Sequence, residues 1–187
     1  MSKNVKAILL PAVVLTAICI VCAAALGGVK LLTQDKIAEQ AAAASNEAMA
    51  ALFPGASFSD SLPPGTGTKD PDGLTFAALQ DGAGIGYAVT SAAKGYGGDI
   101  QVMVGFDTAL RVTKVIVLDA SNETPGLGQN VVKAEWLSQF AGTDTSMAYD
   151  EVDAVASATY SSKGIYNAVI AAGEHLAALI GENGGGN

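Results

Sequence analysis

The sequence predicts an α+β protein in which a single N-terminal transmembrane helix precedes a domain with a mainly antiparallel sheet flanked by helices. An uncharged apolar run occupies residues 7–29, and at about 1.5 Å per residue it is long enough to cross a hydrocarbon core of roughly 30 Å. Four candidate strands lie together between residues 74 and 118, and the last two are rich in β-branched residues. Helical patterns come before and after these strands rather than between them, which favours an α+β arrangement over a doubly wound parallel sheet.

Residues 1–32 are interpreted as a cytoplasmic stub and a transmembrane helix. Lys3 and Lys6 precede the apolar run, and this positive flank favours a cytoplasmic N-terminus with the rest of the chain on the extracytoplasmic side. A cleaved signal peptide is the alternative, because residues 23–25 offer a cleavage site, but the run is longer than the apolar core of most signal peptides. We therefore expect a single-pass anchor that is retained in the cell inner or plasma membrane.

An alanine-rich connecting helix is expected over residues 33–56, where Phe53-Pro54-Gly55 ends it. The extracytoplasmic domain is assigned to residues 57–181 and opens with an irregular segment, 57–73, that is rich in proline and glycine. Strands are then expected at four places separated by turn or loop signals, namely residues 74–79, 84–92, 100–106 and 111–118.

The C-terminal part is expected to be helical. A short helix is predicted over residues 131–140, with Trp136 in the core. A long helix is predicted over residues 161–180, because apolar residues recur at helical spacing at Ile165, Val169, Ala172, Leu176 and Leu179. The glycine-rich tail, residues 182–187, is expected to be disordered.

Composition excludes several classes of function. The net charge is −8 and only 15% of residues are charged, so nucleic acid is not expected as a partner, because phosphate binding needs a clustered basic face. Both cysteines, Cys19 and Cys22, lie inside the apolar run, and the single histidine, His175, lies late in a helix. Neither a metal site nor a Ser-His-Asp triad is therefore expected. No phosphate-binding P-loop is present, and no catalytic residues are predicted.

Three segments stand out: GYGGDI at 95–100, ETPGLG at 123–128 and DAVASATYSS at 153–162. Taken singly, each is typical of a turn. Together, in this order and after a membrane helix, they resemble the FMN-binding domain found in the G subunit of the Rnf complex and in the C subunit of the sodium-pumping NADH:quinone oxidoreductase. The resemblance covers nearly the whole chain, and the intact ETPGLG is specific.

The resemblance implies a covalently bound flavin. In this family a threonine in a motif close to D-x-x-[ST]-G-A-T-x-[ST] is esterified to the phosphate of FMN by a flavin transferase that uses FAD and magnesium. The matching residue here is Thr159. Ala156 and Ser157 depart from the usual serine and glycine, but both are small and keep the hydroxyl accessible.

The residues themselves support a phosphate site at this place. We expect Ser161 to cap the following helix, whose free N–H groups and positive dipole end would stabilise an anion beside Thr159. A plain capping segment is the alternative interpretation, and the two are compatible. The ETPGLG loop is expected to form one wall for the isoalloxazine ring, because its glycines allow close backbone approach and Leu127 supplies an apolar contact.

Tyr96 and the glycines after it are expected to form a second wall, in a loop where Asp99 replaces the proline expected in relatives. The expected flavin-binding residues are Thr159 as the covalent attachment point together with Ser157, Ala158, Ser161, Ser162, Lys163, Asp153, Glu123, Thr124, Gly126, Leu127, Gly128, Tyr96 and Gly97.

The resemblance implies an electron-transfer component of the Rnf complex, a membrane-bound ion-translocating ferredoxin:NAD oxidoreductase, in which the flavin carries the redox chemistry. Its expected partners are the other membrane subunits of the complex, the flavin transferase during maturation, and membrane lipid. The alternatives are a stand-alone membrane-anchored extracellular flavoprotein electron shuttle, the equivalent component of a sodium-pumping NADH:quinone oxidoreductase, and a tethered binding module without flavin.

Overall fold

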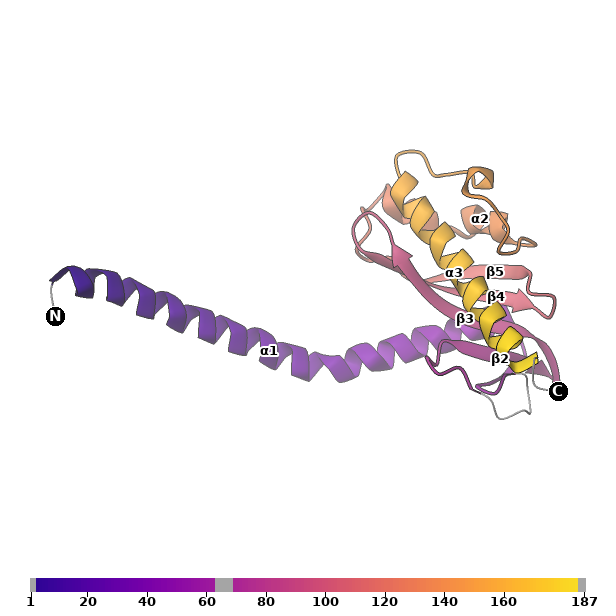
Figure 1. Cartoon of the computed structure of the whole chain (residues 1–187), viewed down its shortest axis with the longest axis horizontal. Helices are drawn as coiled ribbons and strands as arrows, with labels where there is room; N and C mark the ends of the chain where they lie inside the picture. The colour runs from indigo at the N-terminus through magenta and orange to yellow at the C-terminus, as the bar shows by residue number, and fades with distance from the viewer. Residues whose placement is uncertain (1–2, 63–68, 185–187) are drawn as a thin grey trace. The chain divides into compact units, whose positions relative to one another are not determined.

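The N-terminal helix, α1, is one continuous element from Lys3–Leu52, so the expected anchor and connecting helix are not separated (Figure 1). The structure is a computed structural model that describes residues 3–62 and 69–184. The chain divides into two units, residues 1–43 and 44–187. Side chains from Pro11 to Ala43 are all exposed, and this stretch is long and apolar enough to cross a membrane. Helix α3, Thr159–Gly184, meets the same length and composition criterion, but it is partly buried in the second unit.

One five-stranded antiparallel sheet forms the centre of the second unit, in the order β1-β2-β3-β4-β5. The strands are β1 (Ser57–Ser59), β2 (Thr75–Gln80), β3 (Ala83–Lys94), β4 (Asp99–Asp107) and β5 (Val112–Asp119). The four predicted strands are confirmed as β2 to β5. Strand β1 was not predicted, because its three residues lie in the segment expected to be irregular.

Both faces of the sheet are covered in the second unit. Alternate residues of a strand point to opposite faces, and β4 shows this clearly. Val102, Val104 and Phe106 join the cluster beneath α3, whereas Met103 joins the cluster beneath the last turn of α1. Complete burial of such a side chain contributes roughly 1.5–3 kcal/mol, so these two clusters are the main source of stability for the sheet.

Helix α3 lies across one face of the sheet (Figure 1) and uses the predicted apolar stripe to do so. Of that stripe, Ile165, Val169, Ala172 and Leu176 are buried, and Leu179 is half-buried. The helix begins at Thr159, two residues before the expected start. It also extends to Gly184, into the tail expected to be disordered, and residues 185–187 lie outside the described part of the chain.

The single helix predicted over residues 131–140 is wrong. Three short elements stand there instead: η1 (Gly128–Val132), α2 (Ala134–Leu137) and η2 (Ser138–Phe140), with extended backbone at Lys133. A continuous helix turns by about 100° per residue, so it would point Val131, Leu137 and Phe140 in different directions. The break lets all three reach one core, whereas Trp136 is only half-buried.

Candidate functional site

A pocket of about 350 Å³ lies at the N-terminal end of α3, where the three predicted loops meet. Tyr96 comes from the loop between β3 and β4, and Thr124, Leu127 and Gly128 come from the segment that follows β5. The remaining lining residues are Ser157, Ala158, Thr159, Tyr160 and Ser161. Segments separated by up to 65 residues along the chain, from Tyr96 to Ser161, therefore form one site.

Glu123 connects these loops behind the pocket wall. Its side chain is 2% exposed. One carboxylate oxygen accepts a hydrogen bond from the Gly97 backbone N–H at 3.0 Å, and the other accepts a short one from the Ser161 hydroxyl. A buried carboxylate needs such partners, and its place at the first turn of α3 also suits the positive end of the helix dipole.

The glycines around Glu123 are required by space. A Cβ atom at Gly97 would overlap the backbone carbonyl oxygen of Asn122, and one at Gly128 would lie 2.5 Å from a Glu123 oxygen. Since a backbone carbonyl cannot move aside as a flexible side chain can, a larger residue at position 97 would force the two loops apart. The glycines expected to admit a flavin therefore also allow the loops to close on Glu123.

Thr159 is the first residue of α3, and its side chain is exposed at the pocket. Ala158, on its N-terminal side, is 5% exposed. Ser157 has φ of +62°, in the left-handed region that favours glycine, and it stands where the resembled motif has glycine. Thr159 is thus exposed at the pocket and is preceded by small residues.

The first turn of α3 offers unpaired backbone donors. Among the described residues, no acceptor is present for the backbone N–H groups of Thr159, Tyr160 and Ser161, as is usual for the first turn of a helix. The expected cap by Ser161 differs in the structure, because this residue lies inside the helix and its hydroxyl donates to Glu123. The donors therefore remain available to an anion at the pocket.

Two tyrosines form the rim of the pocket. Tyr96 and Tyr160 are each 71% exposed, and their ring centroids lie 6.3 Å apart at an interplanar angle of 49°. Leu127, which also lines the pocket, is 47% exposed. Tyr160 was not among the expected site residues, although an aromatic residue directly after the predicted attachment threonine was a usable signal.

Six of the expected residues do not line the pocket. Lys163 lies with its Nζ over the Tyr149 ring, 5.7 Å from the centroid. The Asp153 carbonyl accepts a hydrogen bond from the Trp136 ring, and the Gly126 carbonyl accepts one from Asn130.

The fourth of these residues, Ser162, is buried and supports the segment before α3. Its hydroxyl accepts a hydrogen bond from the Val155 N–H and donates one to the Ala158 carbonyl, each at 3.0 Å. Glu123 and Gly97 lie behind the wall rather than in it.

A larger groove of about 490 Å³ runs beside β5, between its residues 114–119 and the short helices after it. It contains none of the residues that the sequence predicted for a site. The pocket at the start of α3 is therefore the place where motif residues, exposed hydroxyl and free backbone donors coincide.

Two family models match the chain: an FMN-binding domain over residues 95–174 and an RnfG N-terminal region over residues 1–52. The first match spans all three loops of the pocket. The chain is similar to the G subunit of the ion-translocating oxidoreductase complex of Methanosarcina acetivorans, with 29% identity over 191 residues that cover 96% of this chain and 98% of the relative.

Two further relatives are G subunits of such complexes. The first belongs to the proton-translocating ferredoxin:NAD(+) oxidoreductase complex of Clostridium ljungdahlii. It is 27% identical over 175 residues, which cover 89% of this chain and 90% of the relative. The second belongs to the ion-translocating oxidoreductase complex of Haemophilus influenzae. It is 32% identical over 133 residues, which cover 66% of this chain and 63% of the relative. Among solved structures, the chain is similar to Shewanella oneidensis NqrC, with a TM-score of 0.48, 23% identity, and coverage of 58% of this chain and 60% of that one.

Proposed function

This chain belongs to the family of FMN-binding G subunits of ion-translocating oxidoreductase complexes, and we propose that it carries FMN on Thr159 and relays electrons within a membrane complex of the Rnf type. The observation that carries the proposal is the exposed Thr159 hydroxyl in a pocket lined by all three motif loops. FMN supplies one- and two-electron redox chemistry when it is bound, and the protein holds and tunes it.

The residues of the pocket fit the phosphate end of FMN. Thr159 presents its hydroxyl at the N-terminal end of α3, beside backbone N–H groups that have no acceptor among the described residues. Such donors, with the positive dipole end of the helix, favour an anion. Because attachment forms a phosphodiester that retains one negative charge, the helix end stabilises the product.

The attachment step requires an accessible nucleophile rather than a catalytic centre in this chain. The Thr159 oxygen bonds to the FMN phosphorus of FAD, the pyrophosphate bond breaks, AMP leaves, and the hydroxyl proton is lost. The small residues before Thr159 leave room for the flavin transferase that performs this step. Ala158 is buried and Ser157 has only a short side chain, so neither covers Thr159, which is exposed at the first position of α3.

The pocket also suits the apolar ring of the flavin. Leu127 offers an apolar face on one side, and the rings of Tyr96 and Tyr160 offer aromatic faces at the rim. Offset aromatic stacking contributes about 0.5–1.5 kcal/mol for each ring pair beyond area burial. Gly128, buried between Leu127 and Glu123, brings the backbone close to this space.

The membrane setting follows from α1 and from the family. The apolar stretch of α1 and the RnfG N-terminal match support a membrane location. We propose that the N-terminus is cytoplasmic, that the flavin domain is extracytoplasmic, and that α1 contacts lipid and the other membrane subunits of the complex. The two lysines before the apolar run support this orientation.

The proposal is tested by in-gel flavin fluorescence of the denatured full chain after co-expression with its flavin transferase. Native chain is expected to fluoresce and to gain the mass of FMN less one water. Thr159→Ala is expected to lose both signals, and Thr124→Ala serves as the matched control because it removes another hydroxyl of the same pocket. A flavin signal that survives in Thr159→Ala, or is absent from the native chain with an active transferase, would refute the attachment.

A further inference from the structure

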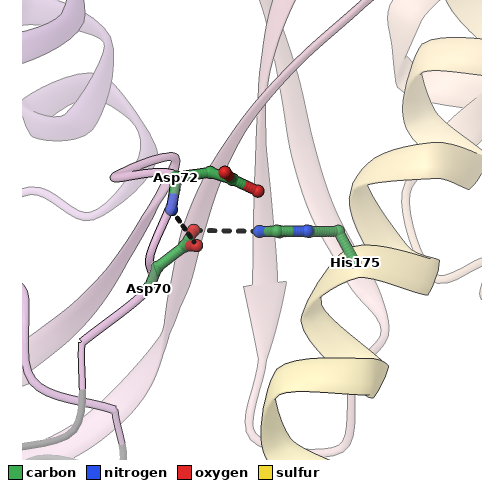
Figure 2. A group of neighbouring side chains, drawn as sticks. All are labelled: Asp70, Asp72 and His175. Atoms are coloured by element: carbon green, nitrogen blue, oxygen red, sulfur yellow. Dashed lines mark hydrogen bonds and ion pairs between the residues drawn. The ribbon is translucent and has the colours of Figure 1, made fainter.

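A second group of polar side chains lies outside the flavin pocket. Asp70 and Asp72 come from the turn before β2, and His175 comes from the second half of α3 (Figure 2). One ligating atom from each lies within 4.8 Å of the others. Figure 2 shows the imidazole pointing from α3 toward the two carboxylates. The proposed flavin function uses none of these residues.

Asp70 is held rigidly at the centre of this group. Its side chain is 1% exposed. One oxygen accepts the Asp72 backbone N–H at 3.0 Å, and the other accepts the Leu74 N–H at 3.1 Å and lies 2.9 Å from His175 Nε2. These bonds fix the carboxylate, so its direction toward His175 is set before any ligand arrives.

Thr75 adds an independent observation at the same place. The residue is 1% exposed, and within the described part of the chain its Oγ1 has no hydrogen-bond partner. Its side chain lies beside Asp70. A buried hydroxyl without a full partner costs about 1–3 kcal/mol, and a metal-bound water would satisfy it.

The charges in the group do not balance. Two carboxylates face one imidazole, and the nearest lysine in sequence, Lys69, pairs with Asp60 instead. A cation bound between these side chains would offset the excess of carboxylate groups.

We propose that Asp70, Asp72 and His175 form a binding site for a divalent cation of the zinc class, with Thr75 hydrogen-bonded to a metal-bound water. Imidazole nitrogen and carboxylate oxygen are ligands that Zn²⁺ accepts together. At the tetrahedral angle that Zn²⁺ prefers, two ligands about 2.1 Å from one ion lie about 3.4 Å apart. The Asp70 oxygen and His175 Nε2 are 2.9 Å apart, so a separation by about 0.5 Å would admit the ion in place of their hydrogen bond. The ligating oxygen of Asp72 lies within 4.8 Å of the other two ligand atoms, and its exposed side chain is free to turn toward the ion.

A cation here would be structural rather than catalytic. It would link the turn at residues 70–73 to α3, and so join the start of β2 to the helix that covers the sheet. Because it is bound by residues of the folded state, it would raise the stability of the second unit by mass action.

The experiment titrates Zn²⁺ into the full chain, purified in detergent with a tag that contains no histidine and stripped of metal with EDTA. Calorimetry is expected to show one saturable site for each chain, and Zn²⁺ is expected to raise the Tm. Asp72→Asn is the sharpest variant, because among the described residues the Asp72 carboxylate makes no hydrogen bond. It is expected to keep the metal-free Tm and to weaken Zn²⁺ binding at least about tenfold.

Two further variants complete the test. His175→Gln is expected to weaken Zn²⁺ binding at least as much as Asp72→Asn. Asp81→Asn removes an exposed carboxylate from the neighbouring β2–β3 turn and is expected to bind Zn²⁺ like the native chain. The proposal is overturned if the native chain shows no saturable binding, or if Asp72→Asn and His175→Gln bind as tightly as Asp81→Asn.

Discussion

Replacing Glu123 should destabilise the flavin domain more than any exposed acidic residue does. The side chain is 2% exposed and joins two loops to α3 through Gly97 and Ser161. A hydrogen bond to a charged group contributes about 1.5–3 kcal/mol. Glu123→Ala removes both bonds and leaves two unpaired donors beside a cavity, so we expect a loss of roughly 3–5 kcal/mol.

Glu123→Gln is expected to cost less, about 1 kcal/mol, because the amide keeps the shape and one acceptor oxygen. Ser161 can then accept from the amide nitrogen instead of donating. A change of 1 kcal/mol shifts the Tm of a domain of this size by roughly 3 °C. We therefore expect a decrease of about 10 °C for Glu123→Ala and about 3 °C for Glu123→Gln.

The assay is the thermal unfolding of the full chain followed by tryptophan fluorescence. Trp136 is the chain's only tryptophan, and its ring packs edge-on against Phe140 at 5.6 Å, so the signal reports on the second unit. Glu174→Gln, an exposed glutamate of α3, is the matched control and should change stability by no more than about 0.5 kcal/mol.

A double-mutant cycle tests the contact itself. If Glu123 and Ser161 are coupled as the structure shows, Glu123→Ala and Ser161→Ala together should cost about 1.5–3 kcal/mol less than the sum of their separate effects. The reasoning is refuted if Glu123→Ala unfolds within 2 °C or so of the Glu174→Gln control, or if the two effects are additive.

Three other substitutions test the pocket. Ser157→Gly should stabilise the chain by about 0.5–1 kcal/mol, because glycine relieves the strain of the left-handed backbone at φ +62°. Ala156→Gly is the control, and equal Tm shifts for the two variants would contradict relief of strain at position 157. Gly97→Ala should lower both the Tm and the flavin loading, because its Cβ would meet the backbone carbonyl of Asn122. Gly181→Ala is the control and should lower neither, because a Cβ there has nothing within 4 Å. Normal flavin loading of Gly97→Ala would disprove the close approach. Tyr160→Ala should weaken the binding of free FMN to the unloaded chain about two- to tenfold, because an aromatic stacking contact is lost. Tyr160→Phe keeps the ring and should bind FMN like the native chain. Equal FMN affinities for the two variants would exclude stacking.

Much of the architecture was predictable because it depends on local patterns. Short segments bounded by turn signals predicted β2 to β5, and the Asp81-Gly82 pair predicted the tight turn between β2 and β3, where both residues have positive φ. The apolar spacing of α3 predicted its buried face. The helix over residues 131–140 was predicted wrongly, because Val131, Leu137 and Phe140 all pack into one core. A continuous helix would point these three side chains in different directions.

The candidate site was predictable in part for the same reason. The three loops and Thr159 were identified from short motifs, and the structure brings the loops together at one pocket. Asp153 was expected there as the first residue of the resembled motif, and Lys163 because its charge lies close in sequence to Thr159. In the structure the Lys163 ammonium lies over the Tyr149 ring, and the Asp153 carbonyl accepts a hydrogen bond from Trp136. The direction of a side chain from a helix or turn depends on the exact backbone dihedral angles, which the sequence motif does not specify.

Neighbouring residues are enough to specify the membrane-length apolar helix, the strands and turns, and the small-residue segment before Thr159. Which distant groups meet depends on how the whole domain packs. Glu123 reaches Ser161 across 38 positions, and Asp70 reaches His175 across 105. Periodicity and turn chemistry are set over a few residues, whereas the partner of a buried carboxylate depends on how the whole sheet and α3 pack, because only that packing removes the carboxylate from water.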